Sequence, residues 1–136
     1  MDKSSWKIGT QAVQGEYWPE NAKSRVVPLE MSTTYRYDTC EELASVFDLE
    51  QDTCMYTRLS NPTTDIFEKK IALMEGGVGA LATASGMAAV SIAVLNICKK
   101  GDSILVSNTI YGGSYTLFTT TFKDLGIEAI MFDPDI

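Results

Sequence analysis

Histidine is absent from this sequence of 136 residues, and its absence removes several kinds of chemistry at once. Ser-His and Cys-His nucleophile pairs are excluded, and so are metal sites with histidine ligands. Any acid–base step must rely on tyrosine, lysine, aspartate or glutamate side chains or on a cofactor. No metal site is therefore predicted.

Cysteine is scarce, and long apolar runs are missing. The three cysteines, Cys40, Cys54 and Cys98, are odd in number and form no Cys-x-x-Cys motif, which indicates free thiols in a reducing compartment. No apolar run approaches the ~18 residues that span a bilayer, and the first residues contain no apolar signal core. We therefore expect a cytoplasmic protein that does not act at a membrane.

Positive charge is in deficit, with 11 lysines and arginines against 18 aspartates and glutamates and a net charge of −7. Nucleic acids and anionic membranes favour a basic surface, so neither is an expected partner. The hydrophobic fraction of 45% and the charged fraction of 21% are ordinary for a globular protein. A chain of this length fits one modest domain or a piece of a larger one.

The first part of the sequence has few regular patterns. In residues 1–37, glycines and prolines interrupt any long periodic pattern of apolar residues, which predicts an extended arm. Residues 39–47 begin with an N-cap residue and an acidic first turn, which predicts a short helix. Residues 48–60 are predicted to form a loop.

The sequence pattern of residues 61–136 predicts alternating helices and strands. Asn61-Pro62 marks a helix start, with asparagine as the cap and proline at the first helical position. The pattern then predicts strand, helix, strand, helix, strand, which is typical of a parallel sheet that binds ligands at the carboxyl ends of its strands. The first of these two helices is apolar nearly all round, so we expect it to be covered on most sides. The predicted strands are 78–84, 103–107 and 127–132, and the helices between them are 87–98 and 113–125.

Three groups of residues are candidates for ligand binding. Ser85-Gly86-Met87 follows a predicted strand and opens a helix, where backbone N–H groups and the helix dipole suit a phosphate. Arg58, close to Tyr56, could add a planar fork of donors to the same anion, and Tyr111 supplies a flat ring near the same edge. Taken singly, each group has an ordinary alternative, as a strand–helix turn, a surface arginine beside a packed ring, or a loop tyrosine.

The segment from Gly77 to Ala82 matches the letters of a G-x-G-x-x-A dinucleotide fingerprint. That fingerprint must follow a strand and open a helix, whereas these glycines follow a helix and open a predicted strand. A Rossmann-type half-domain that binds a nucleotide is therefore a disfavoured alternative.

The candidate groups gain meaning as an ordered set. Tyr56-Thr57-Arg58, Asn61-Pro62-Thr63-Thr64, Ser85-Gly86-Met87 and Tyr111-Gly112-Gly113 occur in an order and spacing that resemble the Cys/Met-metabolism family of pyridoxal-phosphate enzymes. The resemblance covers nearly the whole chain and looks most like the O-acetylhomoserine sulfhydrylase and methionine γ-lyase branch. Methionine γ-lyases commonly carry cysteine where this chain has Gly113, which favours the sulfhydrylase or a more general γ-lyase.

The resemblance implies an α/β fold, namely the N-terminal part of the large domain of a fold-type I (aspartate aminotransferase-like) pyridoxal-phosphate transferase. A mostly parallel sheet with flanking helices would follow an extended arm. The expected division is an arm, short helix and loop in 1–60 and an incomplete cofactor-binding domain in 61–136.

The resemblance also implies roles for the candidate residues. The backbone amides of Ser85, Gly86 and Met87 would cradle the phosphate of pyridoxal 5′-phosphate. Tyr56 and Arg58 would reach the phosphate bound by the neighbouring subunit, so the expected partner is a second copy in a dimer or tetramer. Tyr111 would stack on the pyridine ring and move a proton near the leaving group.

The implied reaction is γ-replacement of an O-acyl-homoserine by sulfide, with methionine or cystathionine γ-lyase activity as the alternative. The family's Schiff-base lysine lies downstream in a Ser-x-Thr-Lys setting, which this chain lacks. We therefore expect an N-terminal portion of a larger enzyme, inactive alone or serving as a cofactor half-site.

Overall fold

The computed structural model describes residues 3–51 and 53–135, which divide into two compact units on either side of the Ala82–Thr83 peptide bond. Residues 61–75, placed by the sequence in the second domain, group here with the N-terminal residues. The predicted domain boundary between residues 60 and 61 stays a prediction, because it concerns the cofactor-binding domain and not the compactness of the chain.

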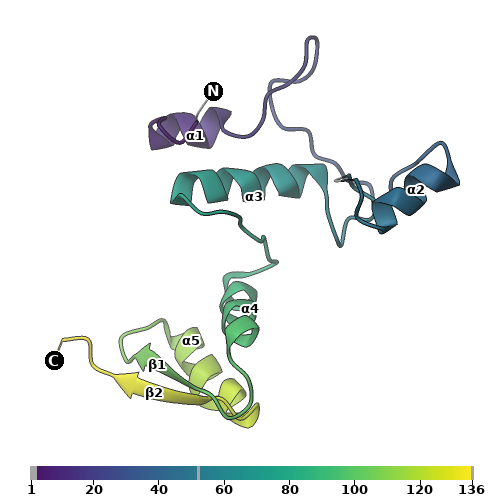
Figure 1. Cartoon of the computed structure of the whole chain (residues 1–136). Helices are drawn as coiled ribbons and strands as arrows, with labels where there is room; N and C mark the ends of the chain where they lie inside the picture. The colour runs from purple at the N-terminus through teal and green to yellow at the C-terminus, as the bar shows by residue number, and fades with distance from the viewer. Residues whose placement is uncertain (1–2, 52, 136) are drawn as a thin grey trace. The chain divides into compact units, whose positions relative to one another are not determined.

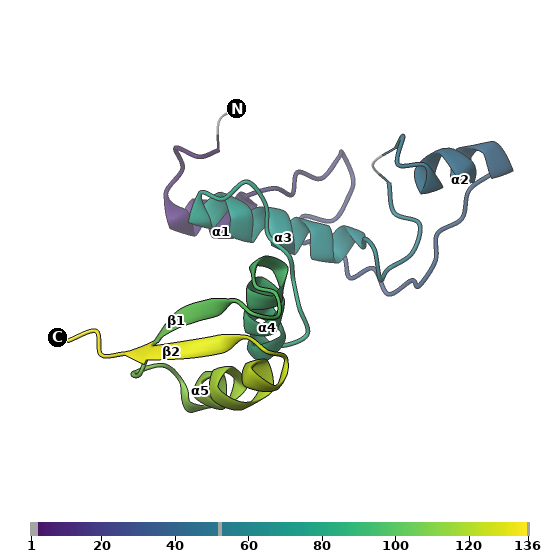
Figure 2. The same ribbon diagram turned by 60° about the horizontal axis from the view of Figure 1, so that its bottom comes forward.

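The N-terminal arm is not extended throughout, so that prediction is wrong for residues 8–14. They form helix α1 (Ile8–Gln14), which lies alongside α3 (Pro62–Glu75) (Figures 1 and 2). The Lys70 ammonium donates to the backbone carbonyls of Ala12 and Val13, at 3.3 Å each. This tertiary contact stabilises a helix too short to be stable alone, which is why local pattern did not reveal it.

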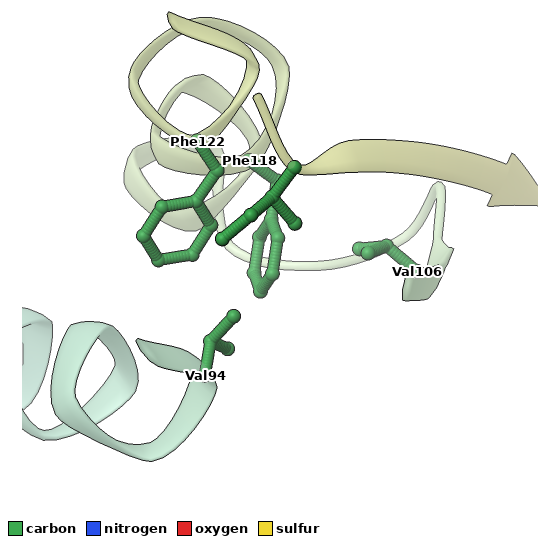
Figure 3. Packing of buried hydrophobic residues seen from close by; sticks show 5 residues of the cluster. Val94, Val106, Phe118 and Phe122 are labelled. Carbon is green, nitrogen blue, oxygen red and sulfur yellow. The ribbon is translucent and has the colours of Figure 1, made fainter. Parts of the chain in front are cut away.

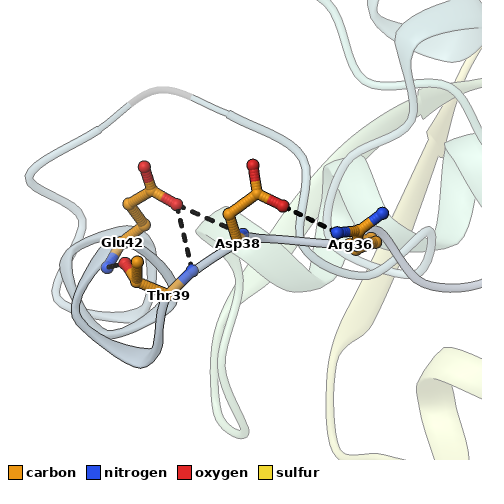
Figure 4. A network of polar contacts seen from close by, with 4 residues as sticks. All are labelled: Arg36, Asp38, Thr39 and Glu42. Carbon is orange, nitrogen blue, oxygen red and sulfur yellow. Dashed lines mark hydrogen bonds and ion pairs between the residues drawn. The ribbon is translucent and has the colours of Figure 1, made fainter.

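The short helix predicted over 39–47 is confirmed as α2 (Cys40–Phe47). Thr39 Oγ1 accepts from the amide of Glu42 at 3.1 Å, and a Glu42 carboxylate oxygen accepts from the amide of Thr39 at 3.3 Å (Figure 4). This reciprocal capping box satisfies two amides that a helix start otherwise leaves unpaired. An exposed ion pair between Arg36 and Asp38 (2.8 Å) adjoins it.

Helix α3 begins as its sequence predicts. Asn61 is the N-cap, and its side-chain oxygen accepts from the amides of Thr63 and Thr64, at 3.0 and 3.4 Å. Pro62 occupies the first helical position, where its missing N–H costs nothing. Gly76 ends the helix in the left-handed region (φ 65°), which glycine adopts without a steric penalty.

The strand predicted over 78–84 does not form. Among the described residues, only 103–107 and 128–132 make up a sheet, and residues 78–84 pair with neither strand. Val78 and Leu81 are exposed, and the amide of Ala82 donates instead to a Glu68 carboxylate oxygen at 2.6 Å. A strand persists only beside a hydrogen-bonded neighbour, so strand-like composition was insufficient here.

The second unit follows the predicted alternation from its first helix onward. Strands β1 and β2 pair in parallel, with Ser103 opposite Glu128 and Ser107 opposite Phe132, which confirms the predicted parallel pairing (Figure 2). The elements are α4 (Gly86–Ile97), β1 (Ser103–Ser107), α5 (Gly112–Thr116), the π-helix η1 (Leu117–Phe122) and β2 (Glu128–Phe132).

An apolar cluster holds these elements together. Phe118 and Phe122 meet edge to face, with ring centroids 5.3 Å apart and an interplanar angle of 80°, a favourable aromatic arrangement (Figure 3). Val94 comes from α4 and Val106 from β1. The buried members of the cluster are Val94, Val106, Phe118, Phe122 and Ile127.

The helix predicted over 113–125 is present, but its middle turns are π-helical. A π segment widens the turn by one residue, and such segments are rare in proteins. Here Phe118, the second residue of the segment, and Phe122, its last residue, both point into the apolar cluster. The irregularity is therefore linked to core packing, which sequence periodicity did not report.

Two apolar surfaces of the second unit are uncovered within the described chain. On β1 and β2, Leu105 and its register partner Ile130 are exposed on the face opposite the cluster. The prediction that the apolar helix is covered on most sides is wrong, since only Val94 of α4 is buried while Ile92 and Leu95 are each 47% exposed. No helix among the described residues is long and apolar enough to cross a membrane.

Candidate functional site

Tyr56 and Arg58 lie together in the first unit. The Arg58 guanidinium carbon is 5.1 Å from the centre of the Tyr56 ring, a distance at which a cation is attracted to an aromatic face. Arg58 is exposed and forms no ion pair with any described residue, so its fork of donors is available to an anion.

The backbone beside this pair is tied to the N-terminal arm. Tyr56 forms an isolated antiparallel bridge with Thr34, and the amide of Thr57 donates to the carbonyl of Thr33 at 2.9 Å. The Thr57 hydroxyl donates to the carbonyl of Ser32. The loop that carries Tyr56 and Arg58 is therefore fixed at its middle residue, although the arginine side chain itself is exposed.

Ser85-Gly86-Met87 forms the start of α4. Ser85 is the N-cap, and its hydroxyl accepts from the amide of Ala88 at 3.1 Å. The amides of Gly86 and Met87 lie in the first turn, where the helix itself offers no acceptor. A Cβ built on Gly86 would meet nothing within 4 Å, so the chain's own packing does not require glycine there.

These features suit a phosphate group. A phosphate at a helix start is bound by free amides and by the positive end of the helix dipole. The open space at Gly86 would let a ligand approach the backbone closely, which a side chain would prevent. The donor set of this turn therefore fits an anionic phosphate.

Tyr111 precedes α5 in the loop that follows the carboxyl end of β1, and its side chain is 75% exposed. A Cβ built on Gly113 would lie 2.6 Å from Cε1 of Tyr111, closer than real contacts allow. The Tyr111 ring thus occupies the space that glycine leaves free. The hydroxyl of Ser114, in the first turn of α5, donates to the sulfur of Met87 at 3.9 Å, which links the start of α5 to the start of α4.

The predicted residues fall into two groups, one in each unit. Tyr56 and Arg58 form one group, in the first unit. The second group, in the second unit, consists of Ser85-Gly86-Met87 at the start of α4 and Tyr111 at the start of α5, two helix starts that are linked by the contact between Met87 and Ser114. No local pattern in the sequence links Ser114 to Met87, which is 27 residues away.

None of the lysines of the second unit belongs to the second group. Lys99 and Lys100 follow the far end of α4, a helix of 12 residues, and such a helix is about 18 Å long. Lys123 follows η1, and Lys100 packs its stem against Gly126. Lys99 and Lys100 therefore lie at the end of α4 opposite to the turn at Ser85.

The sequence profile of a family described as "Cys/Met metabolism PLP-dependent enzyme" matches residues 9–136. An O-acetyl-L-homoserine sulfhydrylase of Leptospira meyeri is 44% identical over 130 residues, which are 95% of this chain and 29% of that protein. A homocysteine/cysteine synthase of Kluyveromyces lactis is 43% identical over 111 residues, covering 82% of this chain and 25% of that protein.

A solved structure is similar to this chain in both fold and sequence. A Campylobacter jejuni protein named as an O-acetylhomoserine (thiol)-lyase superposes with a TM-score of 0.88 and 39% identity, over 97% of this chain and 32% of that one. Its structure contains N′-pyridoxyl-lysine-5′-monophosphate. The chain therefore spans about a quarter to a third of the length of these relatives.

Proposed function

Since the chain belongs to the Cys/Met-metabolism family of pyridoxal-phosphate-dependent enzymes, we propose that it serves in a γ-replacement on an O-acyl-homoserine. In this reaction the bond from Cγ to the acyl oxygen breaks and a bond from Cγ to sulfur forms. With O-acetylhomoserine and sulfide, the products are homocysteine and acetate.

One observation carries this proposal: relatives more than 40% identical to the chain are named for this chemistry. The α/β fold predicted from the sequence is confirmed by the likeness to the Campylobacter structure. The relatives are about three to four times as long as the matched region, so the activity is proposed for a longer enzyme of which this chain forms a part.

The chain's own residues would hold the cofactor by its phosphate. The amides of Gly86 and Met87 and the Ser85 turn would bind the phosphate oxygens, since they combine free donors with a helix start. Bound pyridoxal phosphate supplies an electron sink for carbanions of the amino-acid substrate. Tyr111 would lay its ring against the flat cofactor and hold a proton on its hydroxyl near the departing group.

Tyr56 and Arg58 would complete the phosphate site of a neighbouring copy. Arg58 is exposed and unpaired among the described residues, as a residue that acts across an interface must be before assembly. A guanidinium binds a phosphate through two parallel hydrogen bonds, which lysine cannot reproduce. A homo-oligomer with shared sites is therefore part of the proposal.

We further propose that the chain alone is inactive, because it lacks the Ser-x-Thr-Lys setting of the family's Schiff-base lysine and because Lys99 and Lys100 follow the end of α4 opposite to Ser85. The isolated chain should show no visible absorbance band after incubation with pyridoxal phosphate and dialysis. A retained band near the region typical of a lysine-bound cofactor would overturn this part of the proposal.

The activity is tested on the full-length enzyme with pyridoxal phosphate, O-acetylhomoserine and sulfide. Formation of homocysteine, measured by chromatography, is the expected result. Thiol or ammonia release from methionine or cystathionine without added sulfide would instead assign a γ-lyase. The absence of both activities would overturn the proposal.

The phosphate assignment makes a separate prediction. Arg58→Ala should weaken cofactor binding by about 1.5–3 kcal/mol, the value of a hydrogen bond to a charged group, which is roughly 10- to 150-fold in affinity. Equilibrium titration with pyridoxal phosphate measures this. Arg36→Ala is the matched control, since that arginine is exposed and paired with Asp38. Equal affinities in the two variants would contradict the assignment.

A further inference from the structure

The side chain of Asn61 uses both ends of its amide, although the residue is only 5% exposed. Its oxygen accepts from the amides of Thr63 and Thr64 and so caps α3. Its nitrogen donates to the backbone carbonyl of Glu30 at 2.9 Å and to the Tyr35 hydroxyl at 3.1 Å. The orientation of the amide is fixed by its partners, because two amides need an acceptor and a carbonyl needs a donor.

The nitrogen of Asn61 also lies 3.3 Å from the Thr57 hydroxyl, between Tyr56 and Arg58. Thr63 adds a second link from α3 to the arm. Its hydroxyl donates to the carbonyl of Pro28 at 2.7 Å and accepts from the amide of Glu30 at 2.8 Å. One buried amide and one hydroxyl therefore join the helix start, the arm and the loop that carries the arginine.

A simple N-cap would not need this arrangement. Serine, threonine and aspartate cap helices through an oxygen as well as asparagine does. Only asparagine among the preferred caps also offers a side-chain N–H, and here that donor faces a backbone carbonyl 31 residues away. The capping role explains the oxygen of Asn61, and it leaves the nitrogen unexplained.

We propose that Asn61 is a positioning residue for the cofactor phosphate, because it fixes the loop of Tyr56 and Arg58 against the arm. This inference rests on the proposed function, in which Arg58 binds that phosphate. Arg58 is exposed and its long side chain is costly to order, so a fixed backbone beneath it lowers the cost of binding. The nitrogen of Asn61 contributes that rigidity through Glu30, Tyr35 and Thr57.

Asn61→Asp separates the two roles of the side chain. Aspartate keeps the oxygen that caps α3 and adds a charge that a helix start favours. It removes the donor to the Glu30 carbonyl, which is left without that partner. Thr64→Val is the control, because Thr64 is an exposed neighbour in the same turn whose side chain is not part of these links.

The first measurement is the rate at which the full-length enzyme releases pyridoxal phosphate on dilution. Asn61→Asp should release it roughly tenfold faster, as expected for a loss of about 1.4 kcal/mol, and Thr64→Val at an unchanged rate. The second is hydrogen exchange of the cofactor-free protein, where the amides of Glu30 and Thr57 should lose protection in Asn61→Asp while those of residues 65–75 keep theirs.

The outcomes distinguish this inference from the function beneath it. Failure of the unsubstituted enzyme to bind pyridoxal phosphate would overturn the proposed function and this inference together. Faster release in Arg58→Ala with unchanged release in Asn61→Asp would overturn the positioning role alone. Lost protection throughout α3 in Asn61→Asp would also overturn it, because the effect would then be that of a broken helix.

Discussion

Each of the two units is stabilised internally by a different kind of interaction. In the first unit the buried residues include two polar side chains, Gln11 and Asn61, and its segments are joined by hydrogen bonds from side chains to backbone. In the second, the buried side chains form one apolar cluster around Phe122. Hydrogen bonds are directional and fix geometry, whereas apolar burial supplies cohesion without fixing direction. The arginine that needs precise support is found in the first unit.

The comparison predicts that the largest single loss of stability lies in the second unit. Phe122→Ala removes a ring that is 1% exposed, and truncation of a buried phenylalanine costs about 3–5 kcal/mol. Hydrogen exchange of the amides of residues 103–107 and 128–132 measures this locally.

Phe132→Ala is the control, because its ring is 44% exposed and lies outside the cluster. We expect it to cost much less than Phe122→Ala. Equal losses would show that the cluster does not dominate the stability of this unit and would remove the contrast between the two regions.

A loss of intermediate size is expected in the first unit, at the C-terminal end of α1. A Cβ on Gly15 would lie 2.4 Å from the carbonyl oxygen of Gln11 and 3.0 Å from Cδ2 of Leu73 on α3. Gly15→Ala should therefore cost about 1–3 kcal/mol, as overpacking does, measured by urea unfolding.

Gly9→Ala is the matched substitution at the other end of α1. A Cβ there would meet nothing within 4 Å, so alanine should raise stability by about 0.5–1 kcal/mol through its better helix propensity. If Gly15→Ala raised stability as Gly9→Ala does, the close approach of Gly15 to Gln11 and Leu73 would not constrain this position.

The smallest effect is expected from the exposed ion pair of Arg36 and Asp38, whose side chains are 88% and 80% exposed. Arg36→Gln should change the free energy of unfolding by less than about 0.5 kcal/mol, because solvent screens such pairs. The same unfolding titration measures it. A larger loss would mean that polar contacts at the surface, and not only the buried ones, hold the first unit.

The sequence predicted those parts of the fold that depend on neighbouring residues. Thr39 and Asn61 cap helices through local bonds, and β1 and β2 follow their apolar patterns. Helix α1 and the failed strand at 78–84 depend on distant partners, present in one case and lacking among the described residues in the other. The π segment reflects packing, which periodicity does not contain.

The candidate site shows the same limit. Ser85, Arg58 and Tyr111 were found because their order resembles a family, and the structure shows what surrounds each of them. The sequence does not predict the hydrogen bond from Asn61 to the arm, because an asparagine that only caps a helix and one that also donates to a distant carbonyl occur in the same local pattern. The tertiary structure distinguishes the two cases, because it places the Glu30 carbonyl beside the Asn61 side chain.

The uncovered face of β1 and β2 has a practical consequence for the chain on its own. Leu105 and Ile130 sit side by side on a pair of strands whose outer backbone edges have no partner among the described residues. Such edges accept strands from other molecules, and an apolar face beside them favours the encounter. Concentration-dependent aggregation is therefore the hazard that any preparation of the isolated chain has to manage.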